Sequence, residues 1–185
     1  LVSDNIEALL DENTFTITTG HQLSLFTGPL YFVLKILHVI KLSKTLNKAY
    51  PDTRFVPVFW MASEDHDFEE VQSLNLFTEK LVWDSKETGP VGRFSLDGLD
   101  KIRSEIAALY ENHPDSEIHE LLKHYNGANY AEATLKLVHF IFKKYGLLVV
   151  DGDNSSLKKL FSATIEKELL DEFSFDEVSK TSELL

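Results

Sequence analysis

The densest group of ionisable side chains in the sequence lies at residues 63–70, which read Ser-Glu-Asp-His-Asp-Phe-Glu-Glu. Carboxylates and imidazoles are the groups that most often transfer protons in enzymes. Adjacent ionisable groups repel one another and shift each other's pKa values, which is typical of functional sites. We therefore predict that this stretch supplies the catalytic residues, namely Glu64, Asp65, His66 and Asp67.

Two other interpretations of this stretch stay open. Asp67 and Glu70 have the spacing of a capping box, which would begin a helix over residues 68–74, and Glu69 favours the same first turn. A metal-dependent hydrolase using residues 65–67 is a further alternative. Adjacent side chains point to different sides of the backbone, so we predict no metal site here.

Two further polar groups are candidates for substrate binding. Among the seven histidines, His21 is the best candidate for acid–base chemistry or for contact with phosphate. The free N–H groups expected at residues 28–31 would form an anion site where a helix begins. Residues 27–29 and residues 151–153 also have a simpler interpretation, as helix starts. The predicted substrate-binding residues are Gly20, His21, Gln22, Thr27, Gly28, Pro29, Asp151 and Asp153.

The elements that would position these groups are strands and one long helix. Residues 14–19 are β-branched and aromatic, which predicts a strand, and residues 20–28 follow as a loop. Pro29 then takes the first position of a helix that is apolar almost all round and should be buried. Residues 54–62 predict a strand buried on both faces, although Pro57 argues against a central position. Residues 147–151 predict another buried strand.

The remaining segments fit an α/β chain with an insertion. We predict helices at residues 1–12, 99–112, 116–125, 130–144 and 155–172, and short strands at 76–77, 80–83 and 91–94. The order predicts a Rossmann-like parallel sheet core with helices on both faces and a small inserted mixed region at about 75–128. Ligands of such sheets bind beyond the carboxyl ends of the strands, where all three polar groups fall.

Composition limits the classes of function. The 185 residues are 43% hydrophobic, enough for one core, and the formal charge of −12 argues against nucleic acid as a partner. Without cysteine, the chain has no thiolate nucleophile and no disulfide. The apolar run at residues 29–42 is too short to span a membrane, and no signal peptide is visible, so we expect a cytoplasmic domain. The glycine-rich phosphate-binding motifs are absent.

Two blocks together resemble a known family. Residues 19–31 (Thr-Gly-His-Gln-Leu-Ser-Leu-Phe-Thr-Gly-Pro-Leu-Tyr) and residues 55–70 (Phe-Val-Pro-Val-Phe-Trp-Met-Ala-Ser-Glu-Asp-His-Asp-Phe-Glu-Glu) are similar to the bacillithiol biosynthesis cysteine-adding enzymes, the BshC family. Residues 145–153 fit the next core strand of that family. The family typically has Gly-Gln-Gln where this chain has Gly20-His21-Gln22.

The resemblance implies a ligase that adds L-cysteine to glucosaminyl malate in the last step of bacillithiol biosynthesis. It implies a nucleotidyltransferase-like core, an unidentified cofactor for which ATP is one candidate, and a homodimer formed through a coiled coil. Since family members are longer, we expect residues 1–185 to be an N-proximal fragment that is inactive alone. Residues 175–185 would begin the helical extension. A non-catalytic α/β module that binds a nucleotide or an anionic sugar is the alternative.

Overall fold

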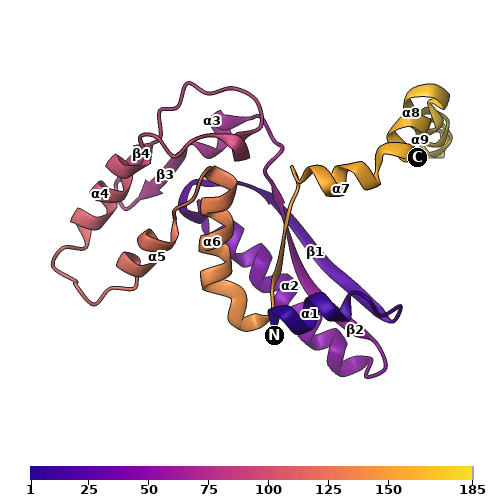
Figure 1. Cartoon of the computed structure of the whole chain (residues 1–185), viewed down its shortest axis with the longest axis horizontal. Coiled ribbons are helices and arrows are strands. Elements are labelled where there is room, and N and C mark those ends of the chain that lie inside the picture. The colour runs from indigo at the N-terminus through magenta and orange to yellow at the C-terminus, as the bar shows by residue number, and fades with distance from the viewer. Residues whose placement is uncertain (185) are drawn as a thin grey trace. The chain divides into compact units, whose positions relative to one another are not determined.

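The computed structural model describes residues 1–184, and Leu185, the last residue of the predicted extension, lies outside the described residues. The helices and strands follow the order expected of an α/β chain with an insertion (Figure 1). In chain order they are α1 (Val2–Ala8), β1 (Thr14–Gln22), η1 (Leu25–Thr27), α2 (Leu30–Ala49), β2 (Arg54–Ala62), α3 (Phe68–Val71), β3 (Ser73–Leu76), β4 (Glu79–Val82), η2 (Val91–Arg93), α4 (Leu99–Leu109), α5 (Ile118–His124), α6 (Tyr130–Phe142), η3 (Lys143–Tyr145), β5 (Leu148–Asp151), α7 (Ser155–Leu160), α8 (Ser162–Asp171) and α9 (Phe173–Glu183).

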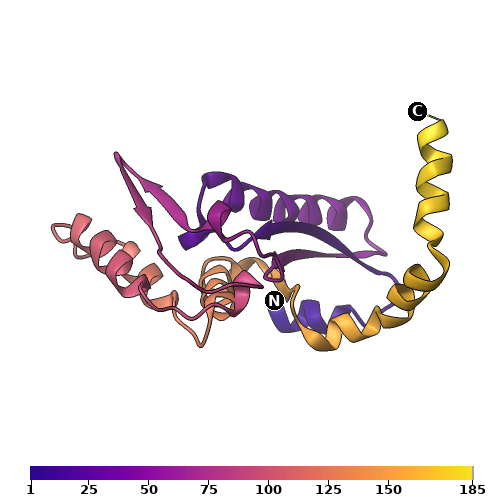
Figure 2. The same cartoon turned by 90° about the horizontal axis from the view of Figure 1, so that it is seen from above.

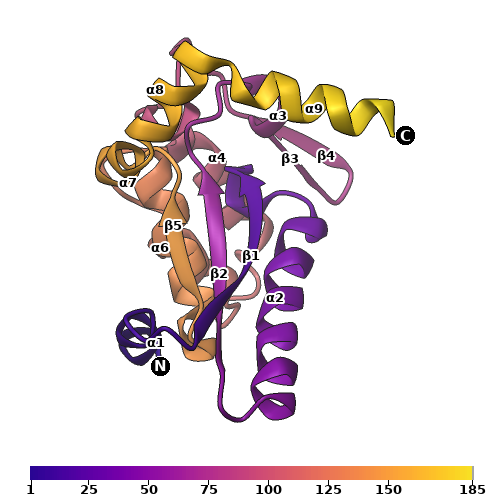
Figure 3. The same cartoon turned by 90° about the vertical axis from the view of Figure 1, so that its right-hand side faces the viewer.

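Within residues 1–184, the main sheet has three parallel strands in the order β1-β2-β5 (Figure 3). The strand at Arg54–Ala62 is predicted correctly, but its central place contradicts the expectation drawn from Pro57. The pairing explains this difference. Strand β5 pairs with β2 only from Val58 onward. Pro57 precedes this paired segment, so its missing N–H removes no hydrogen bond to β5.

Strand β1 is longer than predicted, because residues 20–22 continue the strand instead of forming a loop. Helix α2 begins one residue later than predicted, with Pro29 as the N-cap. It runs lengthwise along the strands (Figure 2) and is not buried all round. Its buried face consists of Phe32, Ile36, Val39, Ile40 and Ser43, whereas Leu30, Tyr31, Leu34, Leu37, His38 and Leu42 are exposed.

Alternate residues of β2 supply two cores. Phe59 and Met61 belong to the larger core, which includes the buried residues of α2 and α6. Val56 and Val58 point the other way and pack with Leu148 of β5 and with Val2 and Ala8 of α1. Helices therefore cover both faces of the sheet, as the sequence predicts for a Rossmann-like domain.

The inserted region lies between β2 and α6 and contains the antiparallel hairpin β3–β4 with helices α4 and α5, grouped beside the sheet (Figure 1). The predicted strand at residues 91–94 is wrong, because Val91–Arg93 forms the short 3-10 helix η2. The predicted helix at residues 68–74 is also wrong in extent, since α3 ends at Val71 and β3 begins at Ser73.

The chain divides into two compact units, Leu1–Gly152 and Asp153–Leu185. The second unit has two helices where the sequence predicts one over residues 155–172, since α7 ends at Leu160 and α8 begins at Ser162. No residue of α7, α8 or α9 is buried. No described helix combines the length and the apolarity needed to cross a membrane.

Candidate active site

The candidate site lies at the carboxyl ends of the three parallel strands, which finish at the same edge of the sheet (Figure 3). In the register of the sheet, Gln22 stands opposite Ala62, and Met61 stands opposite Asp151. The hydroxyl of Ser63, which is fully buried, donates a hydrogen bond to Asp151 Oδ1. Two of the three polar groups that the sequence singles out therefore meet in direct contact at this edge.

Gln22 connects β1 to the segment that follows β2. Its side-chain nitrogen donates hydrogen bonds to Asp65 Oδ2 at 3.0 Å and to Glu70 Oε2 at 2.7 Å. This arrangement contradicts the capping-box interpretation, because Asp67 makes no side-chain cap at the start of α3 and the Glu70 carboxylate accepts from Gln22. Gln22 thus brings two carboxylates towards one nitrogen at the end of β1.

Asp65 is held in its charged form. Its Oδ1 accepts a hydrogen bond from the backbone N–H of Asp67 at 3.0 Å, and Oδ2 accepts from Gln22. The Asp67 N–H and then Gln22 lower the pKa of Asp65 below its usual value, because hydrogen bonds to a carboxylate stabilise the ionised form. Asp65 therefore presents a fixed negative charge, suited to orienting a cationic or hydroxyl-bearing group.

The inserted region fixes the backbone of this segment. The N–H of Val91 donates to the carbonyl of Asp65 at 2.7 Å, and the N–H of Gly92 donates to the carbonyl of Ser63 at 2.9 Å. A Cβ atom at Gly92 would lie 2.6 Å from Ser63 Cβ, so the two backbones can approach this closely only because residue 92 has no side chain. Helix η2 therefore holds the backbone of residues 63–65 in place through two hydrogen bonds.

Glu64 lies against Gly152, and its Oε2 is buried with no hydrogen-bond partner among the residues the structure describes. Its other oxygen accepts from the indole nitrogen of Trp60 at 3.4 Å. A buried carboxylate oxygen without a partner is costly and needs an explanation, such as a ligand or a proton.

Trp60 is a residue that the sequence reasoning missed. It is 39% exposed although it belongs to the central strand, and its indole lies next to Gly20 on the neighbouring strand. The sequence feature that could have identified Trp60 is the glycine opposite it, because Gly20 pairs with Trp60 and leaves room beside the indole. An exposed indole beside Glu64 offers an apolar platform for a substrate.

The predicted residues Gly20, His21 and Thr27 have contacts with α2 or with the inserted region. The ring of His21 packs against Phe32 and Tyr31, with ring centroids 5.3 Å and 5.9 Å away. The carbonyl of Gly20 accepts a hydrogen bond from Lys35. Thr27 lines an apolar cavity of about 180 Å³ bounded mainly by the inserted region and α6.

The predicted run of free N–H groups at residues 28–31 is wrong for its first two residues. The N–H of Gly28 donates to the carbonyl of Leu25 at 2.8 Å, and Pro29 has none to offer. Gly28 itself is needed for its backbone, since it has a φ of 54° and a Cβ there would lie 2.4 Å from Ser24 Cβ.

The side chains of the other predicted residues have different surroundings. The side chains of His66 and Asp67 are exposed at the start of α3. Asp153 belongs to the second unit, where its Oδ1 pairs with Lys158 at 2.6 Å. Within residues 1–184, no group of three or more histidines, aspartates and glutamates is placed to hold a metal ion.

Two buried tyrosines position the loop that follows Gln22. The hydroxyl of Tyr130 donates to the carbonyl of Leu23, and the hydroxyl of Tyr125 accepts from the N–H of Phe26 at 3.4 Å. Burial raises the pKa of Tyr125 to about 12 and raises that of Tyr130 well above its usual value. Both side chains therefore stay neutral and hold the loop through uncharged hydrogen bonds.

Comparisons with known proteins identify a family and several relatives. The family model for "Bacillithiol biosynthesis BshC, N-terminal Rossmann-like domain" matches residues 1–185. A protein of Cytophaga hutchinsonii named "Putative cysteine ligase BshC" is 46% identical over 171 residues, which are 92% of this chain and 31% of that protein. Proteins with the same name from Flavobacterium johnsoniae and Staphylococcus carnosus are 44% and 36% identical, over 98% and 87% of this chain and 35% and 32% of their own lengths. The chain thus spans about a third of the length of the curated relatives it matches.

Proposed function

This chain belongs to the BshC family of bacillithiol biosynthesis proteins, and on that premise we propose that it is part of a ligase that joins L-cysteine to glucosaminyl malate. The relatives are named as cysteine ligases, which supports the reaction class and the amino acid. Glucosaminyl malate as acceptor and a place at the last step of bacillithiol formation are our own extension of that similarity.

One observation carries the assignment of the site. The buried Oε2 of Glu64 lacks a hydrogen-bond partner among the described residues, and it belongs to the same short segment as the ionised Asp65, at the carboxyl ends of the strands. This edge is where parallel α/β sheets bind their ligands. A carboxylate with an unpaired oxygen, beside a carboxylate whose pKa is lowered, is suited to receiving a proton from an amine.

Amide formation sets clear demands on these side chains. The amine of the sugar forms a C–N bond to the carboxyl carbon of cysteine, one oxygen of that carboxyl leaves, and the amine gives up a proton. We assign Asp65 to orienting the amine through its negative charge and Glu64 to accepting the proton. Trp60 would cover the apolar face of the sugar ring, and Gln22 would keep Asp65 in place.

The oxygen that leaves cysteine needs activation, and the chain has no glycine-rich phosphate motif that identifies a nucleotide. We leave the cofactor unassigned, with ATP as the candidate to be tested. We further propose that the full-length protein is a cytoplasmic homodimer joined by a coiled coil. The exposed apolar residues of α8 and α9, among them Leu169, Leu170, Phe175 and Val178, favour such helix pairing.

The test is a product assay with the full-length protein that carries these residues. The protein is incubated with L-cysteine and glucosaminyl malate, with and without ATP, and the thiol product is detected by mass. We expect the mass of the amide in at least one of the two conditions, and the comparison identifies how the carboxyl group is activated.

A folded protein that forms no product under either condition would contradict the ligase proposal. Saturable binding of glucosaminyl malate by that protein would then favour a non-catalytic module that binds an anionic sugar.

A further inference from the structure

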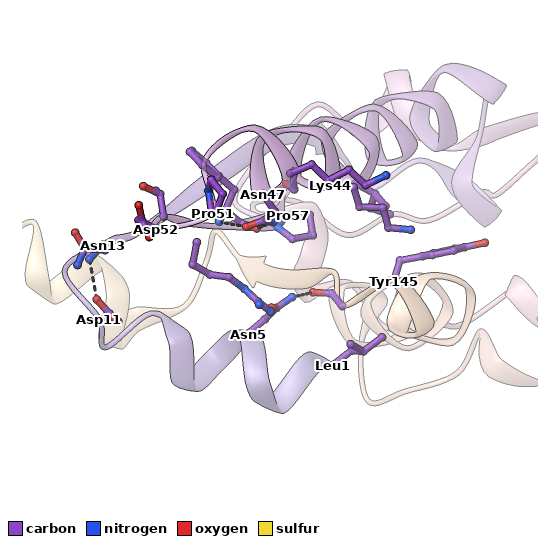
Figure 4. A pocket seen from close by; sticks show the side chains of 17 residues that line it. Leu1, Asn5, Asp11, Asn13, Lys44, Asn47, Pro51, Asp52, Pro57 and Tyr145 are labelled. Atoms are coloured by element: carbon purple, nitrogen blue, oxygen red, sulfur yellow. Dashed lines mark hydrogen bonds between the residues drawn. The ribbon is translucent and has the colours of Figure 1, made fainter.

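A second cavity lies at the opposite end of the sheet from the candidate active site. It has a volume of about 560 Å³, within the range of small-molecule sites, and it lies between α1, α2 and the beginnings of β2 and β5 (Figure 4). Its lining includes Arg54, the first residue of β2, and Gly146, which comes just before β5. All the residues that line it belong to the unit Leu1–Gly152.

Three cations line this cavity although the chain as a whole carries a formal charge of −12. Lys44 and Lys48 are one turn apart on α2, and neither forms an ion pair within the described residues 1–184. Lys44 lies over the ring of Tyr145, 5.0 Å from its centroid. Unpaired lysines facing a shared cavity are typical of sites that hold an anion.

The unpartnered hydroxyl of Ser43 is a second and independent indication of a ligand. Ser43 lines the cavity and is only 2% exposed, and its Oγ has no hydrogen-bond partner within the described residues. A serine on the buried face of a helix normally gains nothing over alanine unless its hydroxyl is used. A ligand in this cavity would supply the missing partner.

Hydrogen bonds among the lining residues hold the walls of the cavity without a ligand. Asn47 holds the start of β2 through hydrogen bonds to both the N–H and the carbonyl of Phe55, at 2.9 Å and 2.8 Å. Asn5 accepts from Arg54 at 2.6 Å and donates to the carbonyl of Gly146 at 2.6 Å. Within the described residues the Arg54 guanidinium donates one hydrogen bond, to Asn5, so its charge is held in position and its other N–H donors are available to a ligand.

The two acidic residues of the lining lie away from Lys44. Figure 4 shows Asp11 and Asp52 at one end of the cavity and Lys44 with Tyr145 at the other. The separation of Lys44 from the two carboxylates favours a molecule with an anionic group near Lys44 and hydrogen-bond donors such as hydroxyls near Asp11 and Asp52. A phosphoryl group, with three oxygens and up to two negative charges, matches three separate cations better than a single carboxylate does.

We propose that this cavity is a binding site for a small phosphorylated molecule that carries hydroxyl groups. Lys44, Lys48 and Arg54 hold the phosphate, the hydroxyl of Ser43 donates to one of its oxygens, and Asp11 and Asp52 accept from the hydroxyl groups. A sugar phosphate and a nucleotide share this chemistry. The site is separate from the candidate active site, so it stands independently of the proposed reaction.

The test measures binding directly by calorimetry on the full-length protein, with inorganic pyrophosphate as the first probe and then a sugar phosphate and a nucleoside diphosphate. We expect saturable binding of pyrophosphate that weakens at least tenfold in the double variant Lys44→Ala and Lys48→Ala. The matched control, Lys41→Ala with Lys80→Ala, removes two exposed lysines that do not line the cavity and should bind as the unaltered protein does.

Ser43→Ala separates a ligand role from a structural one. We expect it to unfold at the same or a higher temperature without ligand, because an unsatisfied hydroxyl is removed, and to bind pyrophosphate roughly tenfold more weakly. Tighter binding of one organic phosphate than of pyrophosphate would identify the source of the ligand. Absence of saturable binding by all three probes, or equal loss in both lysine double variants, would overturn the proposal.

Discussion

Asp65 accepts hydrogen bonds through both carboxylate oxygens, one from the backbone of its own turn and one from Gln22 on the neighbouring strand. The first of these contacts is local, and the second depends on the register of β1 and β2. The sequence could identify Asp65 as a candidate because of the ionisable residues beside it. It could not show that the Glu70 carboxylate accepts a hydrogen bond from Gln22 instead of capping α3, because Gln22 lies 48 positions away in the sequence.

Gly92 gives a prediction at the residue scale. We expect Gly92→Ala to lower the free energy of unfolding by about 2 kcal/mol, because the new Cβ would lie 2.6 Å from Ser63 Cβ and 2.8 Å from its carbonyl oxygen. Chemical denaturation of the two proteins measures the difference.

Gly20→Ala is the matched control for stability. A Cβ at Gly20 would meet Trp60 at ordinary contact distances of 3.6 Å and more, so this change should leave the free energy of unfolding nearly unaltered. Equal stability of the Gly92 and Gly20 variants would contradict the close packing of η2 against the backbone of Ser63.

At the scale of elements, the loop after β1 depends on α6 and the turn before it. Tyr125 and Tyr130 are 1% and 0% exposed, and their hydroxyls contact the backbone of the loop. The raised pKa of each tyrosine means that the folded state binds its proton more tightly than the unfolded state does. Their contribution to stability is complete below pH 10 and is lost as the pH rises from 10 towards 12.

We therefore expect the free energy of unfolding to fall between pH 10 and 12 by about 1.4 kcal/mol per pH unit for each buried tyrosine. The double variant Tyr125→Phe with Tyr130→Phe should show a shallower fall, although it is less stable at neutral pH because it lacks the bond to Leu23. Denaturation at a series of pH values checks this. Tyr50→Phe, at an exposed position, is the control, and identical slopes in all three proteins would refute the explanation.

The elements show which parts of the fold the sequence could predict. The apolar run at Arg54–Ala62 and the helical periodicity of Tyr130–Phe142 specify buried elements locally, and both form as predicted. Residues 91–93 have strand-like composition, but Val91 and Gly92 bond to the backbone of residues 63–65 and so turn into η2. Trp60 was missed because a large aromatic residue within an apolar strand predicts core, and its exposure depends on its neighbour Gly20.

At the scale of the molecule, the division after Gly152 separates the sheet and its site from three helices that bury no residue. We expect a shortened chain of residues 1–154 to keep the unfolding temperature of residues 1–185 within about 3 °C, because the removed residues contribute little to the core. Thermal unfolding followed by circular dichroism compares the two chains. A fall of more than about 10 °C would show that α7, α8 and α9 are part of the cooperative unit.

We assign the chemistry of a cysteine ligase to the carboxylates at the carboxyl ends of the strands. The most direct measurement is kcat/KM for cysteine addition by the full-length protein, compared with the variants Asp65→Asn and Asp115→Asn. Asp115 is an exposed carboxylate in the inserted region and serves as the matched control. We predict a loss of about 100-fold or more for Asp65→Asn and a change within about twofold for Asp115→Asn, with both variants folded. Unaltered kcat/KM in Asp65→Asn would contradict the placement of the active site.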